Sequence, residues 1–413
     1  MPSSQGSSVA MRPAREAGAG EFRLVPEFLT IEQAARLEPE WRALFDAASD
    51  PNPFLGPDFF LPLVRRVAAE RLSGVLVLRR LTLTGLSELA AFFPYRLRSK
   101  FPLTSHPVVE AFAHPFVSDS TPLVRAEGLE AAARGLIDAL ERHFTGHVLV
   151  LDGLRLDGRV GTALQAAAAS LGLPIRQIHS HERATLRAGL SSEAYLRGRV
   201  SGKKLRELRR CEKRLSEHGP VEMTTLAGSD VPAGVREFLG LEASGWKGKR
   251  GTALASNAGT RGFAEAALGT GDAPATVVDV LKVGGKTIAA AIHLVAGPNA
   301  VAFKCAYDES WARMSPGTLL DLRTLRFALD ERRFAVMDSC AVPGHPVEAL
   351  WCDRIRVGEI AIGLGAPCDE DALEAFVRRQ QKLSAWKADA KALAKRLQHL
   401  RAEISSGSYF GRR

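Results

Sequence analysis

The chain has 413 residues, of which 46% are hydrophobic and 24% are charged, and its formal net charge is +9. This length exceeds what one ordinary hydrophobic core fills, so it predicts about two domains, and the composition excludes a disordered or fibrous protein. No stretch approaches the roughly 20 apolar residues that cross a bilayer, and the positive charge favours anionic partners such as a nucleotide cofactor, nucleic acid or acidic lipid.

The start of the chain and its cysteines indicate where the protein works. Residues 1–20 are rich in Ser, Gly, Ala and Arg and have no apolar centre, so we expect a disordered tail rather than a secretory signal. The five cysteines are odd in number and scattered, without zinc or redox spacing. They predict reduced thiols and a cytoplasmic protein.

The first half of the chain alternates strand-like and helix-like segments, as an α/β domain does. Strands are predicted at residues 22–25, 74–81, 86–93, 147–151 and 174–179, and helices at 31–44, 59–67, 129–144 and 161–171. His179 and His181 lie at the end of this series. Because no acidic or cysteine partner lies near them in the sequence, we interpret them as ordinary strand-end histidines and predict no metal site.

After a boundary at residues 183–194, a similar order of elements follows. Helices are predicted at residues 195–218, 231–246 and 261–268, and strands at 221–225 and 276–283. Two successive α/β blocks of similar length predict a tandem of one fold, with domains at 21–185 and 186–366 and a C-terminal helix and tail at 367–413. The identity between the halves is too low for a sequence repeat.

The predicted helix at 195–218 is strongly basic. Between Arg197 and Arg214 it has nine basic residues against two acidic ones, a net charge of +7. Leu205, Leu208 and Leu215 give it an apolar stripe, so it can pack while presenting a basic ridge. A solvated surface and a docking site for a polyanion or for cofactor phosphates both fit this pattern. The candidate binding residues on this ridge are Lys203, Lys204, Arg209 and Arg210.

A hairpin followed by a helix lies at the centre of the second half. Strands at 287–296 and 300–307 flank a Gly-Pro-Asn turn, and both are apolar enough to require burial. Ser315 is the predicted N-cap of the next helix, and Pro316 suits its first position. Free N–H groups beside a strand end suit a phosphate, although an ordinary strand–helix connection also fits.

A long helix is predicted from Asp369 to near the C-terminus. Its apolar residues alternate steps of three and four, as in a heptad seam: Leu383, Trp386, Ala390, Leu393, Leu397 and Leu400. Packing against the body and pairing with a second subunit as a homodimer both remain open, and the shortness of the seam favours packing.

Several motifs in the second half resemble one family. They are Ser201-Gly-Lys-Lys-Leu-Arg-Glu-Leu-Arg-Arg, Leu241-Glu-Ala-Ser-Gly-Trp-Lys-Gly with Gly251-Thr-Ala-Leu, Lys304-Cys-Ala-Tyr-Asp-Glu, and Ser315-Pro-Gly. They resemble the GNAT-superfamily acetyltransferases associated with bacterial cellulose biosynthesis, distant relatives of the FemAB peptidoglycan aminoacyltransferases. The resemblance covers residues 190–365 and, less closely, 22–185.

This resemblance implies an α/β fold of two tandem GNAT-like domains with mixed central sheets, followed by the long C-terminal helix. It also implies that acetyl-CoA inserts between two splayed strands, with its pyrophosphate at the start of the next helix, and that no metal takes part. The cofactor-binding candidates are then Lys304, Ser315, Gly317 and Thr318. The usual glycine-rich phosphate loop is absent, and Ser315-Pro-Gly-Thr318 stands in its place.

Acyl transfer needs a positioned donor, a deprotonated acceptor and a dipole for the oxyanion. As general base we place His345 first, in a loop after a strand predicted at 334–337, because an unperturbed histidine titrates near pH 6.5. Asp308, at the end of the hairpin, comes next, followed by Glu242. His293 and Cys305 lie within predicted strands, and we interpret them as core residues.

The predicted function is transfer of an acyl group, acetyl above all, from acyl-CoA to an amine or hydroxyl of a saccharide or envelope-related acceptor in polysaccharide biosynthesis. Trp246 and Lys247, on a glycine-rich loop, and Tyr307 are the acceptor-binding candidates. The second half would hold the working site, and the first half would be degenerate or acceptor-binding. One alternative is aminoacyl-tRNA-dependent transfer, although a ridge of +7 is modest for a tRNA. Another is a non-enzymatic binder of an anionic polymer.

Overall fold

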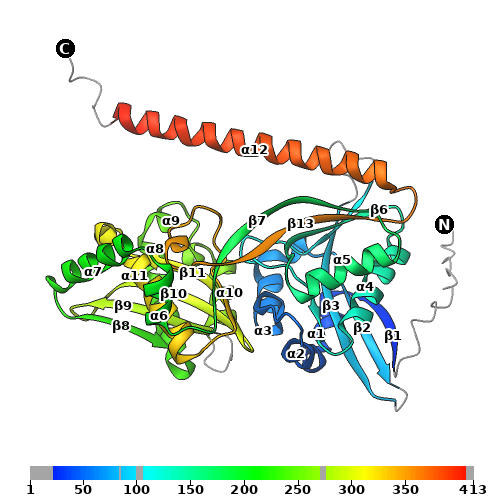
Figure 1. Cartoon of the computed structure of the whole chain (residues 1–413), viewed down its shortest axis with the longest axis horizontal. Coiled ribbons are helices and arrows are strands. Elements are labelled where there is room, and N and C mark those ends of the chain that lie inside the picture. Colours follow the sequence, from blue (N-terminus) through cyan, green and yellow to red (C-terminus); the bar gives the residue numbers. More distant parts are fainter. Residues whose placement is uncertain (1–21, 83–84, 99–105, 270–275, 406–413) are drawn as a thin grey trace, which may run out of the picture.

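The computed structural model describes residues 22–82, 85–98, 106–269 and 276–405 (Figure 1). The tail predicted at 1–20 lies outside these residues. Two lobes lie side by side and share one mixed sheet, in the order β1-β2-β3-β4-β6-β13-β7-β12-β11-β10-β9-β8, with β5 beside β3. The strands are β1 (Phe22–Leu29), β2 (Gly74–Thr82), β3 (Ser87–Arg98), β4 (Val108–Ala111), β5 (Leu123–Val124), β6 (His147–Arg155), β7 (Ile175–Arg187), β8 (Val221–Leu226), β9 (Thr276–Val283), β10 (Lys286–Ala296), β11 (Asn299–Tyr307), β12 (Val336–Asp338) and β13 (Asp353–Leu364).

Helices cover both faces of this sheet (Figure 1). They are α1 (Ile31–Ala35), α2 (Glu38–Asp46), α3 (Pro57–Leu63), α4 (Leu129–His143), α5 (Arg159–Ser170), α6 (Ser192–Arg199), α7 (Gly202–Ser216), α8 (Val231–Ser244), α9 (Trp246–Lys249), α10 (Ala258–Leu268), α11 (Pro316–Arg326) and α12 (Glu370–Ser405). Within the described chain, none of them is both long and apolar enough to cross a membrane.

The same unit occurs twice along the chain. In the first half, β1 to β4 form an antiparallel series, and β4 then runs parallel to β6 after the connection through α4. In the second half, β8 to β11 form the same series, and β11 runs parallel to β12 after α11. This repetition confirms the tandem α/β arrangement predicted from the order of elements.

Two long strands join the lobes. β7 pairs with β13 through most of its length and with β12 through Thr185–Arg187, so it belongs to both lobes. β13 lies between β6 and β7, which are strands of the first half, although it comes late in the chain. The boundary predicted at 183–194 therefore begins inside a strand that reaches Arg187.

A hydrophobic core is shared between the halves on one face of the sheet. It contains Trp41 and Phe60 from α2 and α3 together with Phe238 and Phe263 from α8 and α10. On this face, Phe59 contacts Phe263 edge to face, with ring centroids 5.2 Å apart. Because aromatic side chains from both halves interlock here, the lobes are fixed relative to one another.

The basic segment forms two helices rather than the single helix predicted at 195–218. α6 ends at Arg199, Val200 is extended, and α7 begins after Ser201, whose Oγ accepts a hydrogen bond from the Lys204 N–H at 3.3 Å. A Ser followed by Gly favours a new N-cap over a continuous helix, which explains the break. The apolar stripe is confirmed for Leu208 and Leu215, which are buried.

The long C-terminal helix is confirmed as α12, but it does not pack on the body along its whole predicted seam. Its first turns bury Leu373, Phe376 and Val377 against the sheet. Farther along, Trp386 is 68% exposed, so packing was the wrong expectation at this residue. The side chains of Leu393, Leu397 and Leu400 lie outside the described residues, and the homodimer stays a prediction.

Candidate active site

One edge of β11 is open along two thirds of the strand. β12 pairs only with Asn299, Ala300 and Val301. Beyond Val301, no other strand in the described chain takes up that edge, while the other edge stays paired with β10 as far as Tyr307. The two parallel strands thus diverge, and backbone N–H and C=O groups of β11 remain available to a ligand.

A bulge changes the direction of side chains within β11. Ile292 lies opposite Lys304 and His293 opposite Ala302, so Phe303 is an extra residue. As a result Phe303 and Lys304 both face the other lobe, where the Lys304 ammonium lies 4.7 Å from the ring centroid of Phe116. Burial lowers the pKa of Lys304. Bulges of this kind often re-aim side chains beside functional sites.

The connection from β11 to α11 differs in one respect from the expectation. Ser315 occupies the N-cap position of α11, but its φ is 50° and, in the described structure, its side chain makes no capping hydrogen bond. Its carbonyl accepts the Leu319 N–H at 3.1 Å. This is the first hydrogen bond of the helix, so the helical pattern does not use the N–H groups of Gly317 and Thr318. These groups lie at the positive end of the helix dipole, as an anion site requires.

Gly317 lies against the open strand. A Cβ atom at this position would be 3.8 Å from Cys305 Sγ and 3.8 Å from Tyr307 Cδ1. Asp321 lies one turn farther along the same face of α11. Burial and the charge of Asp279 raise the pKa of Asp321 to about 7, while the charge of Lys204 opposes this rise. No sequence pattern singled out this carboxyl group, because an acid within an amphipathic helix is usually solvated.

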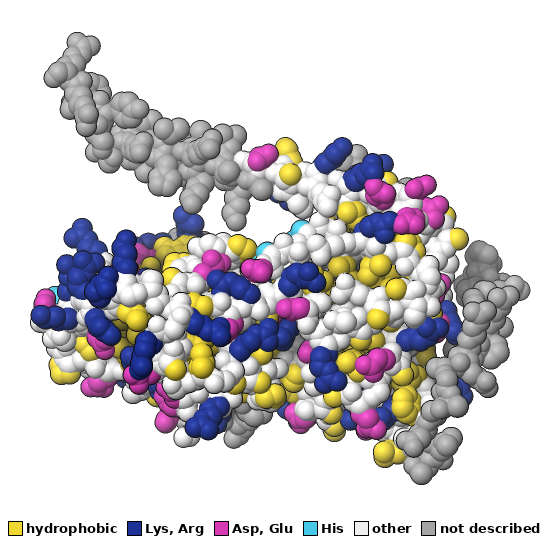
Figure 2. Space-filling model, in the orientation of Figure 1, with side chains coloured by type: hydrophobic (Ala, Val, Ile, Leu, Met, Phe, Trp, Pro, Cys, Tyr) yellow, Lys and Arg dark blue, Asp and Glu magenta, His cyan; other side chains and the backbone are white. Residues whose placement is uncertain are grey.

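The basic face of α7 lies beside this helix. α7 packs through Leu208, Cys211 and Leu215, and Lys203, Arg209 and Arg210 are exposed. Lys204 lies 3.4 Å from Glu207 and acts electrostatically on Asp321 of α11. Figure 2 shows a dense group of Lys and Arg side chains over this end of the second lobe. The ridge and the N-terminal half of α11 thus share one region of positive potential.

Asp308 follows directly after β11, and both of its carboxylate oxygens have interaction partners. Its Oδ1 accepts hydrogen bonds from the Ser310 N–H at 3.0 Å and from the Ser310 hydroxyl at 2.6 Å, and its Oδ2 pairs with Lys286 Nζ at 3.0 Å. These partners, the Ser310 bond first, lower the pKa of Asp308. Its carboxylate is therefore a weaker proton acceptor than an isolated one.

Glu242 is buried and holds the corner between α8 and α9. Its Oε1 pairs with Lys247 Nζ at 3.0 Å, and its Oε2 accepts the Leu254 N–H at 2.7 Å. Trp246, half exposed, donates its backbone N–H to Glu309 Oε1 at 2.6 Å. The predicted acceptor loop is thereby attached to the segment that follows β11.

His345 and Asp338 are placed by β12. The strand predicted at 334–337 is observed as β12, and it pairs with β11. Asp338 lies opposite Val301, seven residues before Asp308, so the two carboxylates do not meet at one strand end. His345 is exposed, and its Nδ1 accepts the Val347 N–H at 3.2 Å. Burial lowers the pKa of His345, so its ring is neutral at pH 7. With Nδ1 occupied, the proton lies on Nε2.

His293 belongs to a buried network under α11. Its Nε2 lies 3.0 Å from Asp279 Oδ2, which also accepts the Thr324 hydroxyl at 2.5 Å. The Thr225 hydroxyl bonds to the other oxygen of Asp279. This is the core role that the strand position of His293 predicted.

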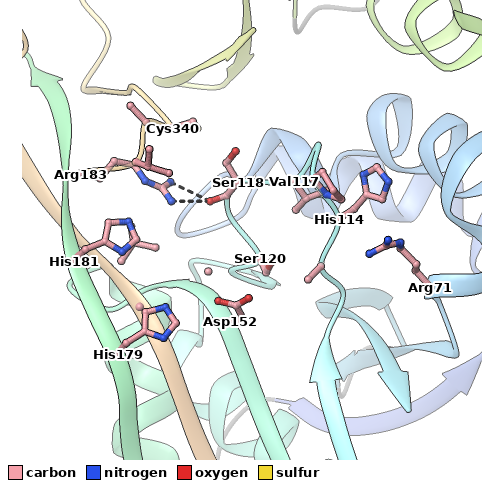
Figure 3. Close-up of a pocket in the computed structure, with 17 residues that line it drawn as sticks. Arg71, His114, Val117, Ser118, Ser120, Asp152, His179, His181, Arg183 and Cys340 are labelled. Atoms are coloured by element: carbon pink, nitrogen blue, oxygen red, sulfur yellow. Dashed lines mark hydrogen bonds between the residues drawn. The ribbon is translucent and has the colours of Figure 1, made fainter. Parts of the chain in front are cut away.

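A pocket of about 400 Å³ lies between the lobes (Figure 3). Its lining combines the segment after β4, the strands β6, β7 and β13, and the segment after β12. The charged and polar lining residues are Arg71, His114, Ser118, Ser120, Asp152, His179, His181, Arg183 and Cys340. His345 is not among its lining residues. Most of these residues lie far apart in the sequence, which is why no motif indicated the pocket.

His114 connects this pocket with the open strand. It lines the pocket, and its Nδ1 accepts the Phe116 N–H at 3.1 Å. Burial and the nearby charge of Arg71 lower the pKa of His114 to about 4. The ring is therefore neutral at pH 7 and carries its proton on Nε2, as a hydrogen-bond donor. Phe116 in turn covers Lys304 of β11.

The second half of the chain matches a known protein family. Residues 202–343 match the family model described as an acetyltransferase (GNAT) domain. The match extends from α7 through the open edge of β11 to the segment after β12. The predicted enzyme class, a GNAT-type acyltransferase, is confirmed. No curated protein matches the chain.

One solved structure shares the fold across both lobes. The chain is similar to a crystal structure of FemX, with a TM-score of 0.51 and 10% identity, over 78% of this chain and 95% of that one. It is also similar to the C-terminal domain of a putative lysylphosphatidylglycerol synthetase from Agrobacterium fabrum, with a TM-score of 0.47 and 15% identity, over 83% and 94% of the two chains. The FemX likeness concerns the fold alone, and it agrees with a tandem, FemAB-like arrangement.

Proposed function

We propose that the protein transfers an acyl group, acetyl from acetyl-CoA, to an amine or hydroxyl of a saccharide or envelope-related acceptor. The match of residues 202–343 to the acetyltransferase (GNAT) domain model supports this proposal. The observation that carries this proposal is the open edge of β11, which leads to the N-terminus of α11. We further propose a role in polysaccharide biosynthesis, which rests on the resemblance to cellulose-associated acetyltransferases. A cytoplasmic location is proposed from the scattered cysteines.

An acyl-CoA donor suits this edge for two reasons. The amide groups of its pantetheine arm can pair with the backbone groups that β11 leaves free beyond Val301. Its pyrophosphate suits the Gly317 and Thr318 N–H groups at the start of α11. Lys204 and the exposed residues of the α7 ridge supply positive charge for the remaining phosphate. Lys304 and Ser315, by contrast, would flank the donor rather than bind its phosphates directly.

The pocket between the lobes is the site we assign to the acceptor. Pro115 and Val117 line it on either side of Phe116, which covers Lys304, so its contents would meet the donor near the bulge of β11. Trp246, Lys247 and Tyr307 stay candidates for acceptor binding, and the charge of Lys247 acts on Lys304 of β11. The N-terminal half then contributes the acceptor-binding wall, through His114, Asp152 and Ser118.

The reaction requires proton removal from the acceptor. As its nitrogen or oxygen forms a bond to the acyl carbon, the C–S bond of the thioester breaks, and the acceptor proton passes to a base. We keep His345 as the first candidate, with Nδ1 as the accepting atom once it is released from the Val347 N–H. Asp308 is the second candidate and Glu242 the third. Asp321 joins this set because a pKa of about 7 suits proton acceptance at neutral pH.

Aminoacyl-tRNA-dependent transfer is the second candidate, because the exposed basic face of α7 also suits RNA. Thermal unfolding with added CoA and acetyl-CoA separates the two. We expect a saturable rise in melting temperature with both, because ligand binding stabilises the folded state. If neither compound changes the melting temperature while a tRNA does, the acyl-CoA donor is wrong. The same melts with an anionic polysaccharide test the non-enzymatic alternative.

A further inference from the structure

Three neighbouring strands present one titratable side chain each to the same small volume. Asp152 comes from β6, Glu359 from β13 and His179 from β7, and one ligand atom from each lies within 4.8 Å of the other two. His179 Nδ1 is 3.0 Å from Glu359 Oε2. Figure 3 shows Asp152 and His179 side by side at one end of the pocket. The expectation that His179 has no acidic partner was wrong, because both partners come from strands distant in the sequence.

The sheet is interrupted on both sides of Glu359. Towards β6, two residues, Asp152 and Gly153, lie opposite this single residue, and Gly153 has a φ of 68° that favours glycine. Towards β7, Ile178 is an extra residue beside the Glu359–His179 pair. A bulge re-aims the side chains next to it. Glu359 and His179 are direct cross-strand partners, so their side chains share one face of the sheet. The bulge opposite Glu359 brings the Asp152 side chain to the same place.

The charges in this cluster are unbalanced without a cation. Asp152 and Glu359 are adjacent carboxylates, and one oxygen of each lies within 4.8 Å of the other and of the His179 ring nitrogen. Two negative charges at this separation produce electrostatic repulsion. A divalent ion would offset all of it, because the ion brings two positive charges to two carboxylates.

We propose that Asp152, His179 and Glu359 bind a divalent transition-metal ion, Zn²⁺ or Mn²⁺. One imidazole and two carboxylates are ligands for such ions, and the imidazole disfavours Mg²⁺ and Ca²⁺. Bonds of about 2.0–2.2 Å put two ligand atoms at most about 4.4 Å apart, so the three groups need only small side-chain rotations to close on an ion.

The pocket determines what this ion would do. Asp152 and His179 line it, so coordination positions that the protein leaves free would face the space of about 400 Å³ between the lobes. Three protein ligands with open positions are typical of ions that bind water or substrate, whereas structural ions are usually enclosed. Along β7, His181 and Arg183 follow His179 on the same pocket wall (Figure 3). An anionic group could therefore lie between the ion and the Arg183 guanidinium.

The test uses the full-length protein, freed of metal with a chelator. Titration with ZnCl₂ is followed by calorimetry, and titration with MnCl₂ by electron paramagnetic resonance. We expect one ion per chain. Asp152→Asn, His179→Gln and Glu359→Gln should each weaken binding by more than about tenfold. His181→Gln is the matched control, because it changes a histidine of the same pocket wall outside the cluster, and it should stay within about twofold of the wild type.

A second measurement guards against misfolded variants. Zn²⁺ should raise the melting temperature of the wild type and of His181→Gln, but not that of the three cluster variants, whose metal-free melting temperatures should stay near that of the wild type. Absence of binding by the wild type would show that His179 is only a protonated partner of two carboxylates, and would overturn the proposal. So would wild-type affinity in any two of the three variants. Neither readout depends on acyl transfer.

Discussion

Arg183 of β7 and Asp338 of β12 form a buried ion pair where the lobes meet. Nη1 of Arg183 lies 2.9 Å from Oδ2 of Asp338, and the side chains are 8% and 9% exposed. The same guanidinium donates from Nη1 and Nη2 to the Ser118 carbonyl, each at 3.0 Å. Oδ1 of Asp338 accepts the Cys340 N–H at 2.8 Å. One pair of residues thus connects a loop of the first lobe with the end of β12.

Removing one partner of this pair should destabilise the protein strongly. Asp338→Ala leaves the Arg183 charge buried without its partner, which typically costs about 3–5 kcal/mol. We expect a loss of this size in the free energy of unfolding, measured with urea. Glu193→Ala is the control, because it removes an exposed partner of Arg197, and exposed pairs contribute at most about 1 kcal/mol. Equal effects of the two substitutions would contradict the assigned role.

Gly317→Asp tests the donor site. The new carboxylate would lie where the donor's pyrophosphate should bind, so CoA affinity should fall more than tenfold, about 1.4 kcal/mol. The affinity is measured by calorimetry. Gly240→Asp is the control, since Gly240 also lies in a helix and a Cβ there meets no other atom within 4 Å. Unchanged CoA affinity in a folded Gly317→Asp variant would rule out this position for the phosphates.

The α7 ridge should bind anionic groups in a salt-dependent way. Replacing Lys203, Lys204, Arg209 and Arg210 with Gln should weaken binding of CoA and flatten its dependence on salt concentration. The control variant replaces four basic residues of the first lobe with Gln, namely Arg23, Arg36, Arg65 and Arg159. Its net charge therefore equals that of the ridge variant. If both variants retain wild-type affinity and salt dependence, the ridge is merely a solvated face.

Asp321 should make stability depend on pH. Its pKa is about 7 in the folded state, whereas the ordinary value for an aspartate is 3.8. Between these two pH values the folded protein therefore holds a proton that the unfolded chain has lost. The free energy of unfolding then falls as pH rises, by up to about 1.4 kcal/mol per pH unit. Asp321→Asn should remove this contribution to the pH dependence of stability, and the variant should be more stable than the wild type at pH 8. Stability curves that run parallel from pH 4 to 8 would show that Asp321 titrates normally.

His345→Ala tests the general base. We expect kcat to fall about 10² to 10⁴-fold, the usual contribution of such a group, with CoA binding unchanged. The acidic limb of the pH–rate profile should disappear, because the neutral ring is the active form. If His345→Ala keeps its rate and Asp308→Asn loses it, the carboxylate is the base. If neither matters, Asp321→Asn is the next variant to assay.

Local patterns predicted the elements of this fold well. The apolar runs at β9, β10 and β11 and the turn after Ala296 follow from residues adjacent in the sequence. The break at Val200 was not predicted, because the helical spacing of apolar residues continues across it. The only local signal for a new helix is the Ser201 N-cap, which affects a single turn. The side-chain cluster in the pocket between the lobes was also not predicted. Asp152, His179 and Glu359 carry no spacing signal, because the sheet order that joins them depends on contacts across the whole chain.

The position of β13 has a consequence for synthesis on the ribosome. Because residues 353–364 complete the sheet between β6 and β7, the first lobe cannot close its ladder until nearly the whole chain has emerged. Its nascent form would expose two unpaired strand edges through most of translation, the kind of edge that invites aggregation or chaperone binding. Folding should therefore be limited by a late, long-range strand insertion, and the two lobes should unfold together rather than one after the other.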